Sequence, residues 1–320
     1  MTNFEYSNTT DLQYWQGIRY LADNYYIMCG TNQTNEGIFY IGDPLNYNSN
    51  NNYILSYPNS QTTSLYGPDY IDNGIYRLVG SYQNKDDNNI YGLFYEGTLY
   101  DFLNSNNYKT ISIGYSYTFI HSTTNNILVG NCDKSNLGPI QAFLMIIDIG
   151  KIINISYPGS TSNTVYGIWY NNDSTYTLCG GYSDLVVTGS EIYVGSIIKP
   201  FGQAYLVNYD IITNEFSNWT TIAYPYDNLD ALTHFQGISS SSKNNYQLAA
   251  DTIYLGKIIT SYVDVNKDSN NEFIVDNWID FVYPLPAIIT SSSNSVSRNI
   301  IVGTYVDKEN NTSAFQLKIN

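Results

Sequence analysis

The chain is poor in the side chains that most often carry chemistry. Its 320 residues include two histidines, three cysteines and 13 Lys plus Arg, against 28 Asp plus Glu, and the formal net charge is −15. No stretch approaches the roughly 18 consecutive apolar residues of a membrane helix, and the first residues contain neither a basic nor an apolar signal segment. We therefore expect no membrane span and a location in the cytoplasm.

Each shortage excludes a class of function. A nucleic-acid groove needs a track of cations that this chain lacks, so no nucleic-acid partner is expected. With only His121 and His234 and no CxxC pair, no zinc site is expected. Phosphate-binding glycine loops, GxSxG and catalytic triads are also missing from the sequence. Cys29 and Cys179 occupy the same position of two repeats, which predicts core packing of free thiols.

What the chain has is a repeat. Mostly apolar tetrads end at regular positions and read IMCG, RLVG, ILVG and TLCG, ending at Gly30, Gly80, Gly130 and Gly180. Weaker copies are QLAA, ending at Ala250, and IIVG, ending at Gly303. The interval from Gly303 through the C-terminus back to Gly30 is about as long as one repeat, which predicts a closed ring of six units.

Each unit carries four short strand-like pieces, shown most clearly by YGIW, YTLC, QAYL and TIAY of the fourth unit. We therefore predict an all-β fold: a six-bladed β-propeller of four-stranded antiparallel blades, forming one domain over residues 1–320. The sixth unit ends after three strands, and the N-terminal FEYSN is expected to complete it and close the ring. The predicted blades are 11–58, 59–114, 115–158, 159–225, 226–284 and 285–320 plus 1–10.

The innermost strand of each propeller blade borders the central channel. Aligning the first strands places one residue of each at the third position of a quartet, namely Arg19, Asp69, His121, Trp169, Ser239 and Ser297. We predict a binding site there, because ligand sites gather a few convergent polar groups in a concavity. The alternative is that strand alternation turns these side chains toward the neighbouring blade.

One acidic stretch resembles the start of a calcium loop. Oxygen-bearing side chains stand at alternate positions: Asp264, Asn266, Asp268, Asn270 and Glu272. Ser269 replaces the turn glycine of such a loop and Val275 replaces its closing glutamate. We therefore expect a solvated hairpin loop in the fifth blade, with calcium as the alternative, and no other cofactor.

Two segments, residues 157–182 and 91–102, resemble the extracellular-type HAF repeat. The triplets Gln141-Ala142-Phe143, Gln203-Ala204-Tyr205 and Ser313-Ala314-Phe315 are similar to its His-Ala-Phe triplet, with the histidine replaced. The resemblance covers four or five of the six units. It implies a propeller and no particular activity.

The excess of Asn, Tyr and Ile also resembles proteins of giant DNA viruses with AT-rich genomes, which implies a virion or host-interaction component. From these patterns we expect a non-enzymatic scaffold that binds a protein or glycan partner, with the insertion at residues 185–201 as the contact surface. The alternative is a metal-assisted hydrolase or lactonase with its site at the central channel. The oligomeric state stays open.

Overall fold

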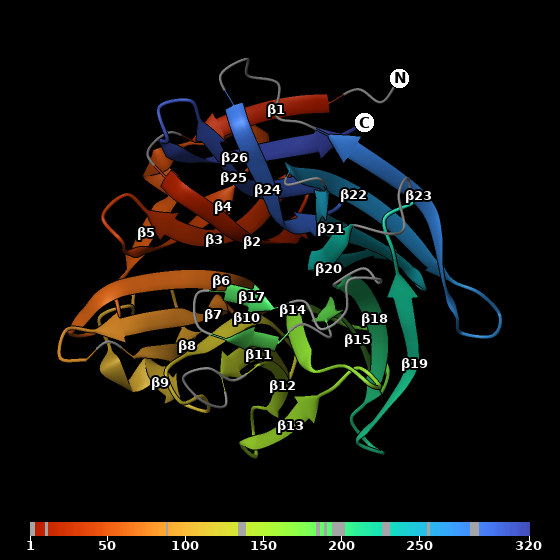
Figure 1. Cartoon of the computed structure of the whole chain (residues 1–320). Coiled ribbons are helices and arrows are strands. Elements are labelled where there is room, and N and C mark those ends of the chain that lie inside the picture. The colour runs from red at the N-terminus through yellow and green to blue at the C-terminus, as the bar shows by residue number, and fades with distance from the viewer. Residues whose placement is uncertain are drawn as a thin grey trace.

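Six four-stranded antiparallel sheets form a ring around a central axis, as the sequence predicts (Figure 1). The computed structural model describes residues 4–9, 12–87, 89–133, 139–183, 186–188, 191–193, 202–225, 231–254, 257–281 and 288–320. Within these residues there is no α-helix, and three short 3-10 turns are present: η1 (Pro44–Asn46), η2 (Ser49–Asn51) and η3 (Ser105–Asn107). The described part of the chain contains no helix with the length and apolar character of a membrane span.

The first three blades follow one another along the chain. Blade 1 contains β2 (Leu12–Ala22), β3 (Tyr25–Asn32), β4 (Gly37–Gly42) and β5 (Asn52–Leu55). Blade 2 contains β6 (Ser60–Asp72), β7 (Ile75–Asn84), β8 (Ile90–Gly97) and β9 (Tyr108–Ile111). Blade 3 contains β10 (Thr118–Thr124), β11 (Ile127–Asp133), β12 (Ile140–Ile146) and β13 (Lys151–Ile155).

The remaining blades complete the ring. Blade 4 contains β14 (Ser162–Tyr170), β15 (Thr175–Ser183), β18 (Gln203–Asp210) and β19 (Glu215–Ile222). Blade 5 contains β20 (Leu232–Ser242), β21 (Asn245–Tyr254), β22 (Lys257–Lys267) and β23 (Phe273–Phe281). Blade 6 contains β24 (Ile288–Ser297), β25 (Ile300–Asp307), β26 (Thr312–Ile319) and the N-terminal β1 (Phe4–Thr9).

The N-terminal strand closes the ring, which confirms the sequence prediction. β1 pairs antiparallel with β26, from Phe4 opposite Ile319 to Thr9 opposite Ala314 (Figure 1). The ring of Phe4 also lies 6.2 Å from that of Phe281 in blade 5. Both ends of the chain therefore belong to one sheet, and neither β26 nor the ring is left with an open edge.

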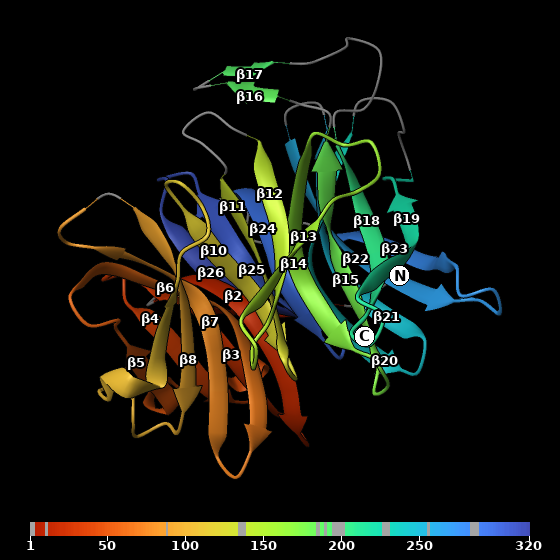
Figure 2. The ribbon, with the colours of Figure 1, turned by 90° about the horizontal axis from the view of Figure 1, so that it is seen from below.

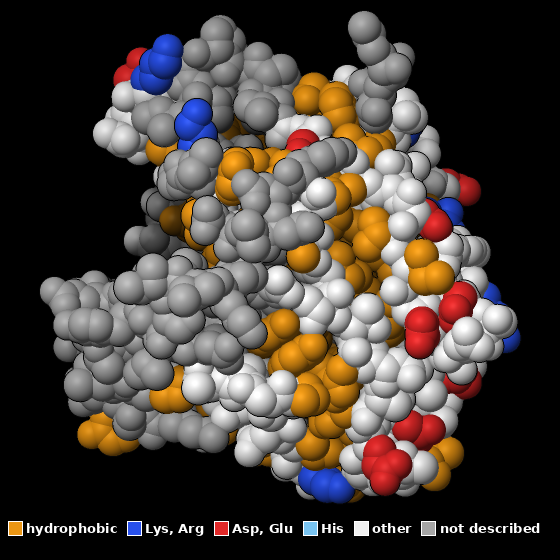
Figure 3. All heavy atoms as spheres, turned by 45° about the vertical axis from the view of Figure 1, so that its right-hand side comes forward, with side chains coloured by type: hydrophobic (Ala, Val, Ile, Leu, Met, Phe, Trp, Pro, Cys, Tyr) orange, Lys and Arg blue, Asp and Glu red, His pale blue; other side chains and the backbone are white. Residues whose placement is uncertain are grey.

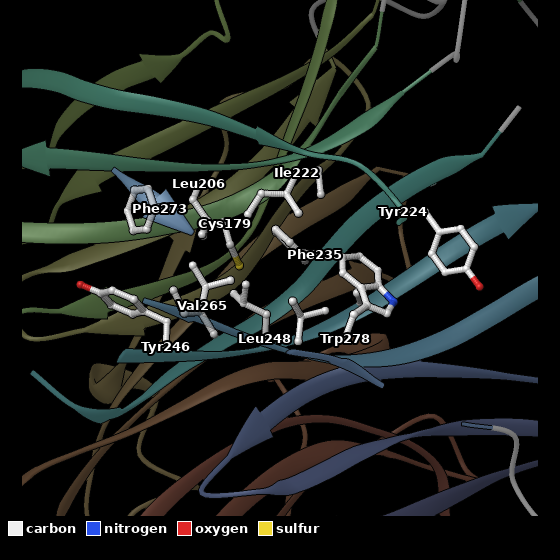
Figure 4. Close-up of a cluster of buried hydrophobic side chains, with 14 of the residues drawn as sticks. Cys179, Leu206, Ile222, Tyr224, Phe235, Tyr246, Leu248, Val265, Phe273 and Trp278 are labelled. Carbon is white, nitrogen blue, oxygen red and sulfur yellow. The ribbon is translucent and has the colours of Figure 1, made fainter. Parts of the chain in front are cut away.

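Apolar side chains fill the spaces between neighbouring blades. Cys179 and Leu206 of blade 4 pack in one buried cluster with Leu248 and Trp278 of blade 5 (Figure 4). All three cysteines are free and buried, so the prediction of core packing for Cys29 and Cys179 is confirmed. Because each blade buries its two faces against its neighbours, the core is shared around the whole ring.

The first strand of every blade contains a β-bulge at an equivalent position. The extra residues are Gln16, Tyr66, His121, Tyr166, Gln236 and Asn294. The repeated glycine of each tetrad lies on the second strand, opposite the residue that precedes the bulge. A Cβ atom on Gly80 would lie 1.9 Å from the carbonyl oxygen of Ser64.

The same close approach occurs in four other blades. Cβ atoms on Gly30, Gly130, Gly180 and Gly303 would meet the corresponding carbonyl oxygen at 1.9 to 2.2 Å. The bulge brings the first strand so close that only glycine fits there without a shift of the backbone. Blade 5 is the exception, because Ala250 stands in this position.

The two faces of the disc differ. The ribbon β16 (Val186–Thr188) and β17 (Glu191–Tyr193) belongs to the insertion between β15 and β18, and it stands off the face where the first strands begin (Figure 2). The rest of the predicted contact surface at residues 185–201 lies outside the described residues. On the outer surface, Asp and Glu side chains are scattered among uncharged polar groups (Figure 3).

Deletion of residues 1–10 is expected to destabilise the whole ring, because it removes the strand that pairs with β26. The deletion leaves the outer edge of β26 unpaired and the last blade one strand short. We expect the thermal unfolding midpoint to fall by several degrees, at least the roughly 2 °C that accompanies about 1 kcal/mol in a chain of this size. Unchanged thermal unfolding would contradict closure by β1.

The substitution Gly80→Ala tests the link between the glycine and the bulge. We expect it to lower the free energy of unfolding by roughly 1–3 kcal/mol, because the new methyl group meets the carbonyl of Ser64. Ala250→Gly is the matched control, and its cost is the chain entropy of glycine, about 0.5–1 kcal/mol. Urea unfolding of both variants gives the comparison, and equal losses would show that the bulge does not require glycine.

Candidate functional site

The first strands of the six blades surround an axial cavity of about 320 Å³. All six bulge residues line it: Gln16, Tyr66, His121, Tyr166, Gln236 and Asn294. Each is partly exposed while the residues beside it on the strand are largely buried. Because a bulge re-aims a side chain that would otherwise follow the alternation of the strand, it turns one residue per blade toward the axis.

Small residues follow the bulge in every blade and bring neighbouring first strands together. Gly17, Gly67, Gly167 and Gly237 hold this position in four blades, and Ser122 and Ser295 hold it in the other two. A Cβ atom on Gly17 would lie 2.3 Å from the carbonyl oxygen of Tyr66 in the next blade. The narrow axis therefore depends on the absence of large side chains immediately after the bulge.

Arg19 forms the floor of the cavity. Its guanidinium extends from blade 1 and donates hydrogen bonds to the carbonyl oxygens of Ile168 at 2.9 Å and Ile238 at 3.0 Å. The same group lies 5.1 Å from the centre of the Trp169 ring. Since these partners belong to blades 4 and 5, the side chain crosses the axis. The prediction that Arg19 points into the channel agrees with this geometry.

Aromatic rings form one side of the cavity. His121 lies between two tyrosines, with ring centroids 5.3 Å from Tyr66 and 4.6 Å from Tyr166. Phe119 and Tyr117 continue the aromatic wall toward the rim, and their rings are 5.3 Å apart. The opposite side is made by amides and small residues, so an apolar wall faces a hydrogen-bonding wall.

Several polar groups of the lining have no partner within the protein. Among the described residues, the side chains of Gln16, His121 and Gln236 make no hydrogen bond to another protein group. In contrast, the amide of Asn294 donates to the carbonyl oxygen of Trp15 at 2.6 Å, and Tyr66 pairs with Ser81 at 2.9 Å. The unpaired donors and acceptors are available to a ligand or to water.

The cavity is electrically neutral except at its floor. Burial lowers the pKa of His121 to about 3 and that of nearby His234 to about 4, so both imidazoles are neutral at pH 7. Burial also raises the pKa of Tyr66 and Tyr166. No Asp or Glu among the described residues lines the cavity. Its chemistry is therefore that of amides, phenols, imidazole and hydroxyls.

Asp133 holds the rim residue Tyr117 in place. Its carboxylate accepts hydrogen bonds from the backbone N–H of Tyr117 at 3.0 Å and from the N–H and hydroxyl of Ser116 at 2.9 and 2.6 Å. These bonds lower the pKa of Asp133 despite its burial. The loop that carries Tyr117 to the cavity is therefore fixed by a charged clamp on β11.

The other residues of the predicted channel ring lie elsewhere. Asp69 borders a separate cavity of about 400 Å³ and accepts a hydrogen bond from the N–H of Asn125 at 3.2 Å. Trp169 faces a groove between blades 4 and 5. Ser239 and Ser297 are buried. The hydroxyl of Ser239 donates to the side-chain oxygen of Gln247, and that of Ser297 accepts from the N–H of Tyr20. None of the four lines the axial cavity.

His121 was aligned with the wrong residues of the other blades. It is the bulge residue of β10, equivalent to Gln16 and Tyr66, whereas Arg19 and Asp69 come three positions after their bulges. The quartet of blade 3 was begun three residues too early, at Phe119, because Ser122 stands where Gly17 and Gly67 begin the quartets of blades 1 and 2. The bulge residues other than His121 were missed; the small residue that follows each bulge was the signal that could have found them.

The candidate calcium residues lie on the hairpin between β22 and β23, which is the predicted loop. Asp268 accepts the N–H groups of Asn270 at 2.8 Å and Glu272 at 2.9 Å, so it caps its own turn. Asn266 donates to Asp276, and Asp264 accepts the hydroxyl of Tyr262. The described residues contain no group of three or more His, Cys, Asp or Glu side chains placed to hold a metal. Calcium binding stays a prediction.

A buried carboxylate joins blades 5 and 6 beside the cavity. Asp251 accepts hydrogen bonds from the N–H and hydroxyl of Ser293 at 2.9 and 3.0 Å, and from the hydroxyl of Ser292. Burial raises its pKa to about 6. Blade 3 uses a neutral group at the equivalent position, where Asn131 accepts the N–H of Val165 at 2.8 Å.

Asp251→Asn is expected to stabilise the protein at neutral pH. A carboxyl whose pKa is raised on folding favours the folded state most below its unfolded pKa, and this contribution is lost as pH rises through about 6. At pH 7 the free energy of unfolding of the variant should exceed that of the parent by on the order of 2–3 kcal/mol. The difference should vanish below about pH 4.

Urea unfolding at several pH values measures this difference. Asn131→Asp is the matched control, and it should destabilise at neutral pH by placing a second buried carboxylate at an equivalent junction. An Asp251→Asn variant that is less stable than the parent at every pH would contradict the argument.

Comparison with known proteins finds distant structural similarity. No family model and no curated protein matches the chain. Similar solved structures include the native arabinanase Arb43A of Bacillus subtilis, at 13% identity, covering 99% of this chain and 97% of that chain with a TM-score of 0.46. An ulvan lyase of polysaccharide lyase family 25 has 8% identity, 93% and 83% coverage and a TM-score of 0.47.

The β-1,2-mannobiose phosphorylase of Listeria innocua is similar at 7% identity, with 98% and 96% coverage and a TM-score of 0.43. Likeness this weak assigns no activity to this chain. The similar structures named here are all enzymes, whereas the sequence led us to expect a non-enzymatic scaffold, and we withdraw that expectation. The alternative of a metal-assisted hydrolase or lactonase with its site at the central channel stays a prediction, and the described cavity lining contains no carboxylate.

Proposed function

We propose that this propeller is a carbohydrate-active protein that binds a neutral saccharide in its axial cavity. The observation that supports the proposal is the ring of six uncharged bulge residues around one cavity. A sugar ring presents C–H faces that pack on aromatic rings and hydroxyls that both donate and accept hydrogen bonds. The C–H faces can pack on the rings of Tyr66, His121 and Tyr166. The hydroxyls can bond the unpaired amides of Gln16 and Gln236.

The size and shape of the cavity restrict the ligand. Its volume of about 320 Å³ lies at the lower end of the roughly 300–1,000 Å³ of small-molecule sites, which suits one or two sugar rings. The guanidinium of Arg19 closes the floor, so a ligand enters from the rim that carries Tyr117 and Phe119. A pocket closed at one end favours the terminal unit of a saccharide over the interior of a long chain.

The lining also limits the reaction. Hydrolysis by the usual mechanism needs two carboxyl groups on either side of the glycosidic bond, and the described lining contains none. The lining instead places the imidazole of His121 between two phenols, and burial keeps all three neutral at pH 7, because it lowers the pKa of His121 to about 3 and raises those of Tyr66 and Tyr166. We infer that His121 and Tyr166 are hydrogen-bonding groups for a bound sugar. The HAF-like and viral resemblances and the cytoplasmic location stay predictions.

Calorimetric titration with maltose, cellobiose and arabinobiose, and with glucuronate as a charged comparison, tests the binding site. Gln236→Leu removes an unpaired amide and should weaken neutral-sugar binding about 5- to 20-fold, corresponding to roughly 1–2 kcal/mol. Gln61→Leu, the same change at an exposed position of β6, should leave binding unchanged. Neutral-sugar binding that Gln236→Leu does not alter would place the ligand elsewhere.

A further inference from the structure

A second, larger depression lies on the opposite face of the disc. It measures about 810 Å³ and is formed by the turns β14–β15, β18–β19, β20–β21 and β22–β23 of blades 4 and 5. The insertion with β16 and β17 connects β15 to β18, so antiparallel topology places it at the other end of these strands. This groove is therefore separate from the rim of the axial cavity.

Lys267 is the half-buried cation of the groove. Its ammonium lies 5.2 Å from the ring centre of Tyr246 and 4.9 Å from that of Phe273. It donates one hydrogen bond, to the hydroxyl of Thr177 at 3.3 Å. An ammonium has three N–H donors, so two remain for another partner.

No carboxylate of the described residues forms an ion pair with Lys267, since the one ion pair among them joins Arg77 and Glu96. Asp173 at the groove edge favours the charge of Lys267 without contacting it, and Lys243 adds a second, exposed cation. Lys267 is thus a partly buried ammonium without an ion pair among the described residues, in a chain with a net charge of −15. Burying a cation without a partner is unfavourable, and an external anion would remove this cost.

The remaining wall is suited to a polyhydroxylated ligand. Asn171 and Asn208 join Thr177 and Tyr246 in a network of hydrogen bonds that fixes the floor of the groove. The indole of Trp169 forms part of the wall. The same ring makes a cation–π contact with the guanidinium of Arg19. Hydroxyl and amide side chains such as Ser217, Asn218 and Ser241 line the open edge.

We propose that this groove binds an acidic saccharide, with its carboxylate or sulfate group on the ammonium of Lys267 and a sugar ring against Trp169. In this arrangement the anionic group of the ligand pairs with the ammonium, its hydroxyls bond the amides, and its sugar ring packs on the aromatic wall. The proposal shares with the axial site only the class of ligand. It does not depend on binding or turnover in the axial cavity.

The test titrates the full chain with trigalacturonate, inorganic sulfate or neutral maltotriose. Binding is followed by the change in tryptophan fluorescence or by the heat measured in a calorimeter. Lys267→Met removes the charge and keeps an apolar side chain over Tyr246 and Phe273. We expect it to weaken trigalacturonate binding by at least about tenfold. Lys257→Met, on an exposed residue of the same strand, should have no effect.

The pH dependence gives a second readout. Burial lowers the pKa of the Lys267 ammonium to about 8, with Asp173 opposing the shift. Affinity for the anion should therefore be constant below about pH 7 and fall as pH rises through 8, because only the protonated amine attracts it. Lys243 and the phenol of Tyr246 also border the groove, and the Lys267→Met variant separates their titration from that of Lys267.

The outcomes separate the proposals. Binding of trigalacturonate that is lost in Lys267→Met and unchanged in Gln236→Leu supports an acidic-saccharide groove, whatever happens at the axial cavity. Binding of sulfate but not of trigalacturonate would contradict the proposal that the ligand is a saccharide. Equal affinity for maltotriose and trigalacturonate would contradict the proposal that the ligand is an anion. No binding at about 10 mM of any probe, or full binding by Lys267→Met, overturns the proposal altogether.

Discussion

The close approach between a bulged first strand and a glycine on the second strand is the constraint on which the ring depends. Each bulge inserts one residue, and in five of the six blades the backbone before it comes so close to the second strand that Gly80 and the equivalent glycines leave no room for a Cβ atom. The extra residue turns toward the axis, and the small residue after it lets the next blade approach. Packing and the lining of the cavity thus have one local cause.

This device separates scaffold from recognition. The tetrads and the small residues after the bulges are nearly the same in every blade because backbone geometry restricts them. The bulge residue has no partner on the second strand, so its identity is free to differ. Blades 2, 3 and 4 use Tyr66, His121 and Tyr166, and the other three use amides. Because the bulge residue is aromatic in three adjacent blades and an amide in the other three, the cavity has an aromatic wall that faces a polar wall.

Charge differs between the outer surface and the axial cavity. Acidic side chains are visible on the outer surface in Figure 3, while the described axial lining carries only the guanidinium of Arg19. The groove on the opposite face places Lys267 among hydroxyls and amides. Asp251 is a further departure from the repeat, since Asn131 makes an equivalent bond without the cost of a buried charge.

The repeat in the sequence was enough to predict six blades, four strands in each and closure by the N-terminus, because these features depend on local periodicity and chain length. It also placed Arg19 at the axis. The identity of the ring around the cavity depended on tertiary structure. Blade 3 has Ser122 in place of the glycine that follows the bulge in four other blades, so the sequence pattern aligned the bulge residue His121 with Arg19, which comes three positions after its bulge. The groove around Lys267 was equally hidden, since turns far apart in the chain meet there only after neighbouring blades pack.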